Sequence, residues 1–405
     1  MSILFYLFAA LLVYLSARSL LGGVAYFRFF QAELERQPVD HHPFATMIAP
    51  CKGLDKGLAE NLTSLFEQVY PEFEIVFVVD DGTDPAVSTI NEVIAHCSGH
   101  GANGRLVIAP KASGSSQKVE NLREAVLHAD ERSEVFVFVD SDARPNRNWL
   151  GHLVAPLEEG SVGATTGYRW FISEKMTFAS ELRSAWNASI ASALGANTKT
   201  NFCWGGATAI RREVFDRLDM RERWSGTLSD DFTVTRVIKR AGLEIRFVPG
   251  ALTPSPGECG LREAIEFTTR QMQITRVYAA HLWLLSYFGS ALFTFVMVSA
   301  FLIVLLSPQV DYLVWSAIAT FLLVTFLSIG KSFLRLKAVR MVIPSASKQA
   351  LTQMTYWLLT PPLFLYTCIY AMVSRRMTWR GIRYVLVSSE RTLRLSDTEN
   401  SSLAD

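Results

Sequence analysis

The sequence predicts an α/β fold in which a doubly wound, mostly parallel sheet forms a soluble middle part between N-terminal and C-terminal transmembrane helices. Two observations lead to this prediction. Short runs of β-branched and aromatic residues, of which Phe73–Val79 and Val135–Val139 are the clearest, alternate with segments of helical spacing, as in a buried parallel sheet. Long apolar stretches precede and follow this alternation, and the charged residues, 19% of the chain, concentrate between them.

The overall composition argues against several classes of protein. The 405 residues carry a formal net charge of +1, and no basic stripe or RNA-binding motif occurs, so no nucleic-acid partner is expected. The five cysteines are scattered and lack metal-ligand spacing, which indicates neither a disulfide framework nor a zinc site. A reduced, cytoplasmic setting fits the middle part.

The N-terminal segment, residues 1–30, is predicted to be an uncleaved membrane anchor. Ser2–Tyr26 contains a single charged residue, Arg18, and is long enough to cross a bilayer. No Lys or Arg precedes this apolar core, whereas Arg28 and Arg36 follow it, so the positive-inside rule places the downstream residues in the cytoplasm. The alternative, a signal peptide, is disfavoured because it carries its positive charge in front of the apolar core.

The C-terminal membrane region, residues 281–374, contains three candidate segments. Leu282–Leu306 and Tyr312–Gly330 are uncharged and long enough to span a bilayer. Thr355–Val373 has two adjacent prolines near its centre, which interrupt helical hydrogen bonding and indicate a kinked span or a re-entrant hairpin. Basic residues on both sides of this segment favour re-entry. Residues 375–405 are predicted to be a basic juxtamembrane stretch and tail.

The soluble middle part, residues 40–257, is predicted to alternate strands and helices. The expected strands are Phe44–Pro50, Phe73–Val79, Arg105–Ala109, Val135–Val139 and Glu244–Val248. The expected helices are Leu58–Val69, Ala86–His96, Gln117–Ala129 and Asp230–Arg240. Two glycines in the segment 201–210, beside a tryptophan, indicate a close approach of the backbone to a ligand or a strained turn.

Carboxylates follow two of the expected strands. Asp81 comes after Phe73–Val79, and Asp140 and Asp142 come after Val135–Val139. Open α/β sheets bind ligands at the carboxyl ends of their strands. There Asp81 can accept hydrogen bonds from a nucleobase, and the i, i+2 pair can hold a divalent cation on a diphosphate. Acidic residues also end strands and cap helices without any ligand, so each pair alone is a weak signal.

Two further positions could complete such a site. Lys118 opens a helix after a Gly-Ser-Ser turn, where a cation and helix N–H groups favour a diphosphate; a solvated surface lysine is the alternative. Asp230 and Asp231 open another helix, either as caps or with one carboxylate taking a proton from an attacking hydroxyl. The absence of a Gly-x-Gly-x-x-Gly motif or a phosphate loop after either acidic strand disfavours an NAD or ATP site.

Residues 258–280 are predicted to form an interfacial amphipathic helix. An apolar stripe in this segment adjoins a polar face that includes Gln273 and Arg276. These two side chains are three residues apart, so they can reach the same ligand. Simple packing at the membrane surface is the alternative.

Together these motifs resemble a known family. Asp81, then Asp140-Ser141-Asp142, Asp230-Asp231 and Gln273-Ile274-Thr275-Arg276, between an N-terminal anchor and C-terminal membrane segments, resemble the inverting membrane glycosyltransferases of family 2 type with a GT-A fold. Within that group the likeness is nearest to ceramide glucosyltransferases. Asp81-Gly82-Thr83-Asp84-Pro85-Ala86 is similar to their first motif, and 378–384 to their basic C-terminal segment, so the resemblance extends to about Tyr384.

Two positions depart from the family pattern. Val277 stands where the last motif has tryptophan, with Tyr278 beside it. Asp142 stands where the ceramide enzymes have a non-acidic residue, so this motif is nearer to the wider family. Both departures bear on which lipid serves as the acceptor more than on the sugar-transfer reaction itself.

The resemblance implies a role for each motif. Asp81 is expected to contact the uracil of a UDP-sugar, with glucose as the sugar, and Asp140 with Asp142 to bind its diphosphate through Mg²⁺ or Mn²⁺. Asp231 is expected to be the catalytic base that deprotonates a lipid hydroxyl. The remaining substrate-binding residues are expected to be Lys118, Asp230, Gln273 and Arg276.

The expected protein is therefore a multi-pass integral membrane enzyme with its catalytic domain in the cytoplasm, a UDP-sugar donor, the lipid bilayer as partner and ceramide as acceptor. Transfer to a hopanoid, diacylglycerol or polyprenyl phosphate stays open, as does polysaccharide synthesis, although a processive synthase needs more membrane helices. A membrane scaffold or transporter is disfavoured because the carboxylates lie in the soluble part, whereas transporters carry ionisable residues inside membrane spans.

Overall fold

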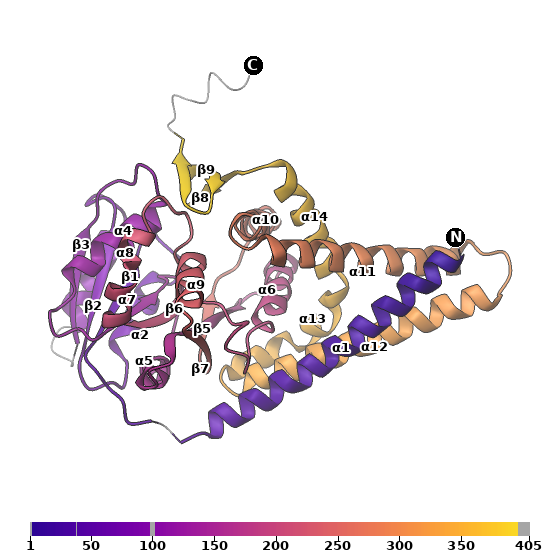
Figure 1. The fold of residues 1–405 in the computed structure, drawn as a ribbon, viewed down its shortest axis with the longest axis horizontal. Helices are drawn as coiled ribbons and strands as arrows, with labels where there is room; N and C mark the ends of the chain where they lie inside the picture. The colour runs from indigo at the N-terminus through magenta and orange to yellow at the C-terminus, as the bar shows by residue number, and fades with distance from the viewer. Residues whose placement is uncertain (1, 38, 98–101, 396–405) are drawn as a thin grey trace, which may run out of the picture. The chain divides into compact units, whose positions relative to one another are not determined.

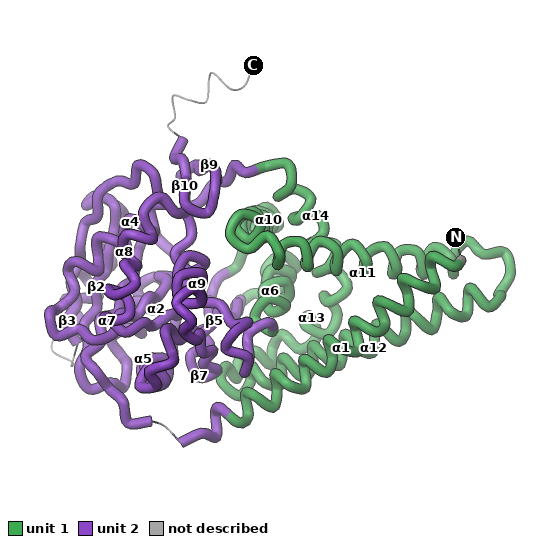
Figure 2. The backbone as a smooth tube through the Cα atoms, in the orientation of Figure 1, with its two compact units in different colours: residues 1–32, 175–192, 258–374 green, residues 33–174, 193–257, 375–405 purple. Residues whose placement is uncertain are grey.

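The computed structural model describes residues 2–37, 39–97 and 102–395. These residues form two compact units, each assembled from segments that are far apart in the sequence (Figure 2). The helical unit consists of Met1–Ala32, Lys175–Ser192 and Glu258–Ser374. The sheet unit consists of Glu33–Glu174, Ala193–Gly257 and Arg375–Asp405.

The sheet unit contains a seven-stranded sheet with the strand order β3-β2-β1-β4-β6-β5-β7 (Figure 1). Its strands are β1 (Ala45–Pro50), β2 (Phe73–Val79), β3 (Ala102–Ile108), β4 (Val135–Val139), β5 (Val162–Ile172), β6 (Ala207–Arg211) and β7 (Glu244–Pro256). Neighbouring strands pair in parallel except at β6, which runs antiparallel to both β4 and β5. β2 and β4 have the bounds that the sequence predicts. The mostly parallel sheet confirms the predicted fold class.

Helices connect these strands. They are α2 (Leu58–Phe66), α3 (Ala86–Cys97), α4 (Gln117–Ala125), α5 (Trp149–Val154), α7 (Arg212–Arg217), α8 (Met220–Arg223) and α9 (Asp230–Arg240), with short 3₁₀ turns at Val126–His128 and Ala155–Glu158. All residues of β2 and β4 are buried, as expected of central strands covered on both faces.

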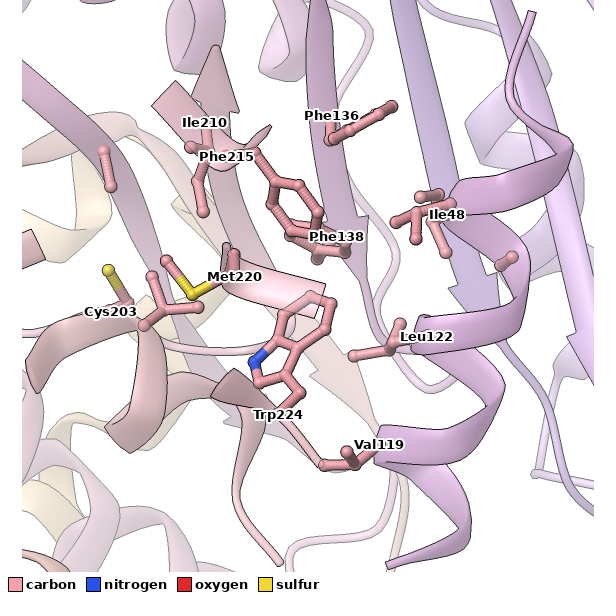
Figure 3. Packing of buried hydrophobic residues seen from close by; sticks show 14 of the residues in the cluster. Ile48, Val119, Leu122, Phe136, Phe138, Cys203, Ile210, Phe215, Met220 and Trp224 are labelled. Carbon is pink, nitrogen blue, oxygen red and sulfur yellow. The ribbon is translucent and has the colours of Figure 1, made fainter. Parts of the chain in front are cut away.

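An aromatic core fixes α4 and α8 against the sheet (Figure 3). Phe138 of β4 meets Trp224 edge-to-face at a ring-centroid distance of 5.3 Å. Val119 and Leu122 of α4 belong to the same buried cluster. Such edge-to-face aromatic contacts stabilise a core beyond what the burial of apolar area contributes. The first turn of α4, which carries Lys118, is therefore held firmly at the end of the sheet.

The C-terminal residues of the sheet unit form a second, three-stranded antiparallel sheet. It consists of β8 (Arg376–Trp379), β9 (Ile382–Ser388) and β10 (Arg391–Arg394), in the order β10-β9-β8. Sequence analysis treats residues 375–405 as a basic stretch and tail and foresees no sheet there. In the structure Tyr384 and Leu386 are fully buried, so this segment has a core side despite its basic composition.

The helical unit contains α1 (Ser2–Glu35, of which the last three residues belong to the sheet unit), α6 (Phe178–Ala191), α10 (Leu261–Tyr278), α11 (Ala280–Leu306), α12 (Tyr312–Arg340), α13 (Ala350–Thr355) and α14 (Thr360–Val373), with 3₁₀ turns at Pro344–Gln349 and Tyr356–Leu358. Among the described residues, three helices are long and apolar enough to cross a membrane: Ile3–Glu35, Ala280–Leu306 and Tyr312–Arg340. They pack together through small and aliphatic residues, among them Ala9, Ala300 and Ala317.

The segment with the paired prolines is bent. Pro344–Leu358 and Thr360–Val373 meet at an angle of 60°, so together they form either a broken span or a re-entrant loop. The prolines occupy the first turn of α14, where their missing N–H groups cost no helical hydrogen bond. The sequence predicts an interruption near the centre of Thr355–Val373, whereas in the structure α14 begins at Thr360 and the prolines lie in its first turn.

Candidate active site

The site residues that the sequence predicts in the sheet unit follow the carboxyl ends of β2 and β4 and open α4 and α9. β1 alone separates β2 from β4, and all three strands are parallel, so their carboxyl ends share one edge of the sheet. The ion pairs there form two groups. The Asp80 cluster consists of Asp80, Asp81, Lys52 and Lys111. The Asp140 cluster consists of Asp140, Asp142, Asp230, Lys118 and Arg169.

Two cations bind the carboxylates of the Asp140 cluster. Lys118 Nζ lies 2.8 Å from Asp140 Oδ1 and 3.3 Å from Asp230 Oδ1. Arg169 Nη2 donates to Asp140 Oδ2 at 2.6 Å, and its Nη1 donates to Asp142 Oδ2 at 3.1 Å. The side chains of Lys118 and Arg169 are only 15% and 12% exposed. Water screens these charges poorly, so they interact strongly.

Backbone contacts explain why Lys118 meets Asp230, which is far away in the sequence. Ser116 caps α4: its Oγ accepts from Val119 N at 3.2 Å and donates to Leu228 O at 2.7 Å. Ser116 N also donates to Thr227 O at 3.0 Å. The start of α4 is thus tied to the loop that precedes α9, and Lys118 and Asp230 lie in the first turns of these two helices.

The protonation states in the Asp140 cluster follow from burial and charge. Burial is the main cause that raises the pKa of Asp230 to about 6; Lys118 opposes this shift, and the neighbouring carboxylates reinforce it. Burial also acts to raise the pKa of Asp140, but the charges of Lys118 and Arg169 outweigh it and hold the pKa below its ordinary value. Asp230 therefore titrates nearer to neutral pH than Asp140.

Asp231, the predicted catalytic base, has different surroundings from Asp230. It is half-buried in the first turn of α9, and its Oδ1 accepts hydrogen bonds from Ser229 Oγ and, at 2.7 Å, from Phe232 N. These donors orient the carboxylate at the start of the helix. Asp230 instead is turned toward Lys118. The adjacent aspartates thus have different contacts: Asp230 belongs to the ion cluster, and Asp231 is held by Ser229 and by the backbone of its own helix.

A glycine pair lines the Asp140 cluster. A Cβ atom on Gly205 would collide with Asp230 Oδ2 and lie 2.9 Å from Lys118 Nζ, and a Cβ on Gly206 would lie 2.6 Å from Asp140 Oδ2. Glycine is required here because the backbone passes directly against the buried charged side chains. The sequence signal for close approach at this segment is explained by these contacts.

The Asp80 cluster combines a buried carboxylate, Asp80, with an outer part that is open to solvent. Lys52 Nζ and Lys111 Nζ contact Asp80 at 2.9 Å and 3.1 Å, and Lys111 also reaches Asp81 Oδ2 at 3.0 Å. The side chains of Asp81 and Lys111 are 44% and 51% exposed. Asp81 Oδ1 accepts from Thr83 N and Thr83 Oγ1, and these hydrogen bonds, followed by Lys111, hold the pKa of Asp81 well below its usual range.

The second sheet contacts the loops around both clusters. Arg380, in the β8–β9 turn, binds Asp55 through two hydrogen bonds of 2.5 and 2.9 Å, and Asp55 Oδ2 also accepts from Ser141 Oγ at 2.8 Å. Tyr384 Oη accepts from Gln117 N, the first residue of α4, at 3.1 Å. The C-terminal segment therefore supports the turn that carries Asp140 and the helix that carries Lys118.

A comparison with known protein families shows which family has this sequence pattern. The sequence profile of Glycosyl transferase family 21 matches residues 8–392. The chain belongs to glycosyl transferase family 21. The match covers most of the predicted anchor, both ion clusters and most of the second sheet. This membership agrees with the resemblance to ceramide glucosyltransferases and establishes a glycosyltransferase.

Individual relatives match this family 21 chain at low sequence identity or over only part of its length. A ceramide glucosyltransferase of Candida albicans is 30% identical over 122 residues, which is 28% of this chain and 22% of the relative. The mannosyltransferase PcManGT from Pyrobaculum calidifontis, solved with GDP-Man and Mn²⁺, is 18% identical with a TM-score of 0.47, over 90% of this chain and 99% of the other. GalNAc-T7, solved with UDP, GalNAc and Mn²⁺, is 14% identical with a TM-score of 0.40, over 54% and 44% of the two chains. At TM-scores below 0.5, these structural similarities assign neither a ligand nor a residue role here.

Gln273 and Arg276 belong to the helical unit. Both lie on α10 and donate hydrogen bonds to carbonyl groups at the end of α14: Gln273 Nε2 to Ser374 O at 3.1 Å, and Arg276 Nη1 to Met372 O at 2.9 Å. Basic groups at a helix C-terminus satisfy its last carbonyls and complement its dipole. The Arg276 guanidinium also lies 5.7 Å from the ring centre of Trp283, so an aromatic contact exists although Val277 replaces the family tryptophan.

A divalent metal fits the donor set of this family 21 chain only if the substrate completes its coordination. Within residues 2–37, 39–97 and 102–395, no group of three or more His, Cys, Asp or Glu side chains is arranged to hold a metal ion. Asp140 and Asp142 nevertheless converge on one cation, the guanidinium of Arg169. Mg²⁺ and Mn²⁺ accept few protein carboxylates when phosphate oxygens and water supply the other ligands. The residues present therefore fit such an ion.

Sequence reasoning missed several residues of these clusters. Arg169 lies in β5, which no sequence pattern predicted, and Lys52, Lys111 and Asp55 lie in loops. Arg380 was noted only as part of a basic segment. A basic residue next to aromatic ones in an apolar run, as in Tyr-Arg-Trp-Phe at 168–171, is the one signal that could have identified Arg169, because a lone arginine in a buried strand needs a carboxylate partner.

Proposed function

We propose that this family 21 glycosyltransferase transfers a sugar, glucose, from a UDP-sugar to the hydroxyl of a membrane lipid, ceramide, with inversion at the anomeric carbon. The Asp140 cluster carries the chemical part of the proposal, because its carboxylates and cations lie at the sheet edge where α/β folds bind nucleotides. The local similarity to a ceramide glucosyltransferase supports ceramide as acceptor.

The donor is proposed to lie across both clusters. Asp81, partly exposed, accepts hydrogen bonds from the uracil, while Asp140 and Asp142 hold the diphosphate through Mg²⁺ or Mn²⁺. When bound, the metal offsets the negative charge that grows on the departing diphosphate. Lys118, in the first turn of α4, adds a cation for the same group, and its ion pair with Asp230 keeps the ammonium in place.

Asp231 is proposed as the catalytic base. Its Oδ1 is held by Ser229 and Phe232 N, so we assign Oδ2 to the acceptor hydroxyl. As the hydroxyl oxygen attacks the anomeric carbon opposite the diphosphate, Asp231 takes its proton, the new glycosidic bond forms and the bond to the diphosphate breaks. A single in-line displacement of this kind inverts the anomeric configuration. Positioned proton transfer contributes about 10²–10⁴-fold to such reactions.

The membrane setting is part of the proposal. Three helices of spanning length support an integral, multi-pass protein embedded in the bilayer, and the basic residues after the first of them support a catalytic domain in the cytoplasm. Gln273 and Arg276 are proposed to bind the substrate from α10, in addition to their contacts with α14. An acceptor confined to the bilayer and a soluble donor meet most efficiently in an enzyme fixed at the membrane surface.

The test uses the purified full-length protein in nanodiscs with UDP-glucose, Mn²⁺ and ceramide. UDP release and the lipid product are followed by mass spectrometry, with Asp231→Asn as the matched variant. We expect a hexosylated ceramide from the native protein, at least about 10²-fold less from the variant, and unchanged UDP binding in both.

Other results lead to different conclusions. UDP release without a ceramide product contradicts the acceptor and directs the search to hopanoid, diacylglycerol, polyprenyl phosphate or a growing polysaccharide. Full turnover by Asp231→Asn contradicts the assignment of the base. If Asp230→Asn instead abolishes turnover while UDP binding persists, the neighbouring carboxylate is the base.

A further inference from the structure

The guanidinium of Arg169 lies between the two carboxylates that are proposed to hold the metal. Its Nη2 donates to Asp140 Oδ2 at 2.6 Å and approaches Asp142 Oδ1 at 3.4 Å, while its Nη1 donates to Asp142 Oδ2 at 3.1 Å. Lys118 takes the remaining oxygen, Asp140 Oδ1. All four carboxylate oxygens of the pair therefore already face a cation that belongs to the protein.

Aromatic rings hold Arg169 in this position. The guanidinium carbon lies 4.8 Å from the ring centre of Trp204 and 5.3 Å from that of Phe171. A guanidinium that is stacked on aromatic faces and almost excluded from solvent is a built element of the site, since a flexible surface side chain would extend into water.

A divalent ion and this guanidinium compete for the same carboxylate oxygens. Mg²⁺ or Mn²⁺ needs direct contact with oxygen, at roughly 2.0–2.6 Å for hard divalent cations. A guanidinium at hydrogen-bond distance from the same oxygens would repel the ion at short range in a poorly screened site. Repulsion between the two cations therefore favours release of the carboxylates by Arg169 when a metal binds, and Arg169 then needs another anion.

The diphosphate of the donor is the anion that this site is proposed to receive. We propose that Arg169 is a placeholder cation: it occupies Asp140 and Asp142 while the site lacks donor, and it exchanges these carboxylates for the diphosphate oxygens when the nucleotide sugar and the metal arrive together. The planar fork of arginine suits phosphate as well as carboxylate. This inference rests on the proposed function, because it assumes a nucleoside diphosphate donor.

The consequence is a thermodynamic coupling between metal and nucleotide. Metal alone must displace Arg169 without compensation, so it binds weakly. With the diphosphate present, the guanidinium gains a new partner, and the metal binds more tightly. By linkage, the metal tightens nucleotide binding by the same factor. Direct ligation of the metal by the diphosphate also couples the two ligands, so the contribution of Arg169 is the part of the coupling that is lost when Arg169 is replaced.

The experiment measures Mn²⁺ binding, followed by the electron paramagnetic resonance signal of free Mn²⁺, in the full-length protein in nanodiscs with and without saturating UDP. We expect UDP to increase the Mn²⁺ affinity of the native protein by at least about tenfold. Arg169→Gln removes the placeholder, so its affinity for Mn²⁺ alone should exceed that of the native protein by about tenfold, and the effect of UDP should shrink.

Two further variants serve as controls. Arg246→Gln removes an arginine of comparable burial on β7, paired with Glu159 outside both clusters, and should retain the native coupling. Arg169→Lys keeps the charge but loses the planar fork, so Mn²⁺ alone should bind as weakly as in the native protein, with a reduced UDP effect.

The outcomes separate this inference from the proposed function. If Arg169→Gln binds Mn²⁺ no more tightly than the native protein, or if UDP binds but does not change the native Mn²⁺ affinity, the placeholder role is wrong and the glycosyltransferase proposal stands. If neither UDP nor GDP binds, the proposed function fails and this inference with it. Should Arg169→Gln not fold, Arg169→Lys decides the question, because a UDP effect as large as that of the native protein would contradict the exchange.

Discussion

The Asp80 and Asp140 clusters arise from the same sequence pattern, a fully buried parallel strand followed by aspartates, yet they have different environments. Lys111 and Asp81 are about half exposed, whereas Lys118 and Arg169 are almost enclosed. Exposed ion pairs are screened and exchange partners readily, while enclosed ones are strong and costly to break. The pattern thus locates carboxylates at the edge of the sheet, but the surrounding elements determine the strength of their interactions.

The largest expected difference concerns the two lysines. Lys118→Met leaves two buried carboxylates without their shared cation, which should lower the free energy of unfolding by about 3 kcal/mol and abolish donor binding. Lys111→Met should change stability less, because Lys111 is half exposed and buried Asp80 keeps Lys52 as a second cation. Denaturant unfolding in detergent and UDP binding measure both effects. Equal destabilisation by the two variants would contradict the contrast between the clusters.

The next largest effect on stability is expected at Gly205, which packs against the Asp140 cluster. Gly205→Ala places a methyl group onto Asp230 and Lys118, which cannot move outward, and should cost about 1–3 kcal/mol and most of the activity. Gly114→Ala is the matched control, since no atom lies within 4 Å of the position that its Cβ would take, so it should leave stability and turnover nearly unchanged. Thermal unfolding and UDP release under identical conditions provide the measurement. A silent Gly205→Ala would mean that the cluster is looser than the contacts indicate.

Asp230 and Asp80, one from each cluster, should also respond to pH with opposite sign. Burial raises the pKa of Asp230 to about 6, so the folded protein takes up a proton before the unfolded chain does, and this contribution to stability is lost as pH rises from about 4 to 6. For Asp80, burial acts to raise the pKa, but Lys52 and Lys111 outweigh it and lower the pKa, so its contribution is lost as pH falls below about 4.

The free energy of unfolding, measured from pH 3 to pH 7, tests whether Asp230 and Asp80 contribute to stability in these opposite directions. Relative to the native protein, Asp230→Asn should gain at most about 3 kcal/mol of stability between pH 4 and pH 7. The loss of stability of Asp80→Asn relative to the native protein should be smallest at the acid end of this pH range. Parallel pH profiles for the native protein and Asp230→Asn would contradict the raised pKa.

The smallest expected effect concerns the support that the second sheet gives to the Asp140 cluster. Tyr384→Phe removes the hydrogen bond from Gln117 N at the start of α4 and should cost about 1 kcal/mol, because the N–H group is left buried without this acceptor. Tyr366→Phe, at a half-exposed position in α14, is the control and should be neutral. Chemical unfolding distinguishes them. A neutral Tyr384→Phe would show that water replaces the phenol.

The sequence by itself determined the features that depend on local pattern. The bounds of β2 and β4 and the positions of Asp81, Asp140 and Asp142 at strand ends could be predicted because the burial of a parallel strand requires a continuous apolar run, and its end is where polar residues return. The membrane helices could be predicted for a similar reason, since the bilayer imposes length and composition on each span separately.

Only the tertiary structure decided which cations meet these carboxylates. Arg169 comes from β5, the glycine pair from the loop before β6, and Arg380 from the second sheet, and no local periodicity relates these segments to Asp140. Their placement depends on strand order, on the antiparallel insertion of β6, and on the contact of Ser116 with Leu228. Charge pairing between distant segments follows from packing, because the energy of a buried charge depends on what surrounds it in space and not on its neighbours in the chain.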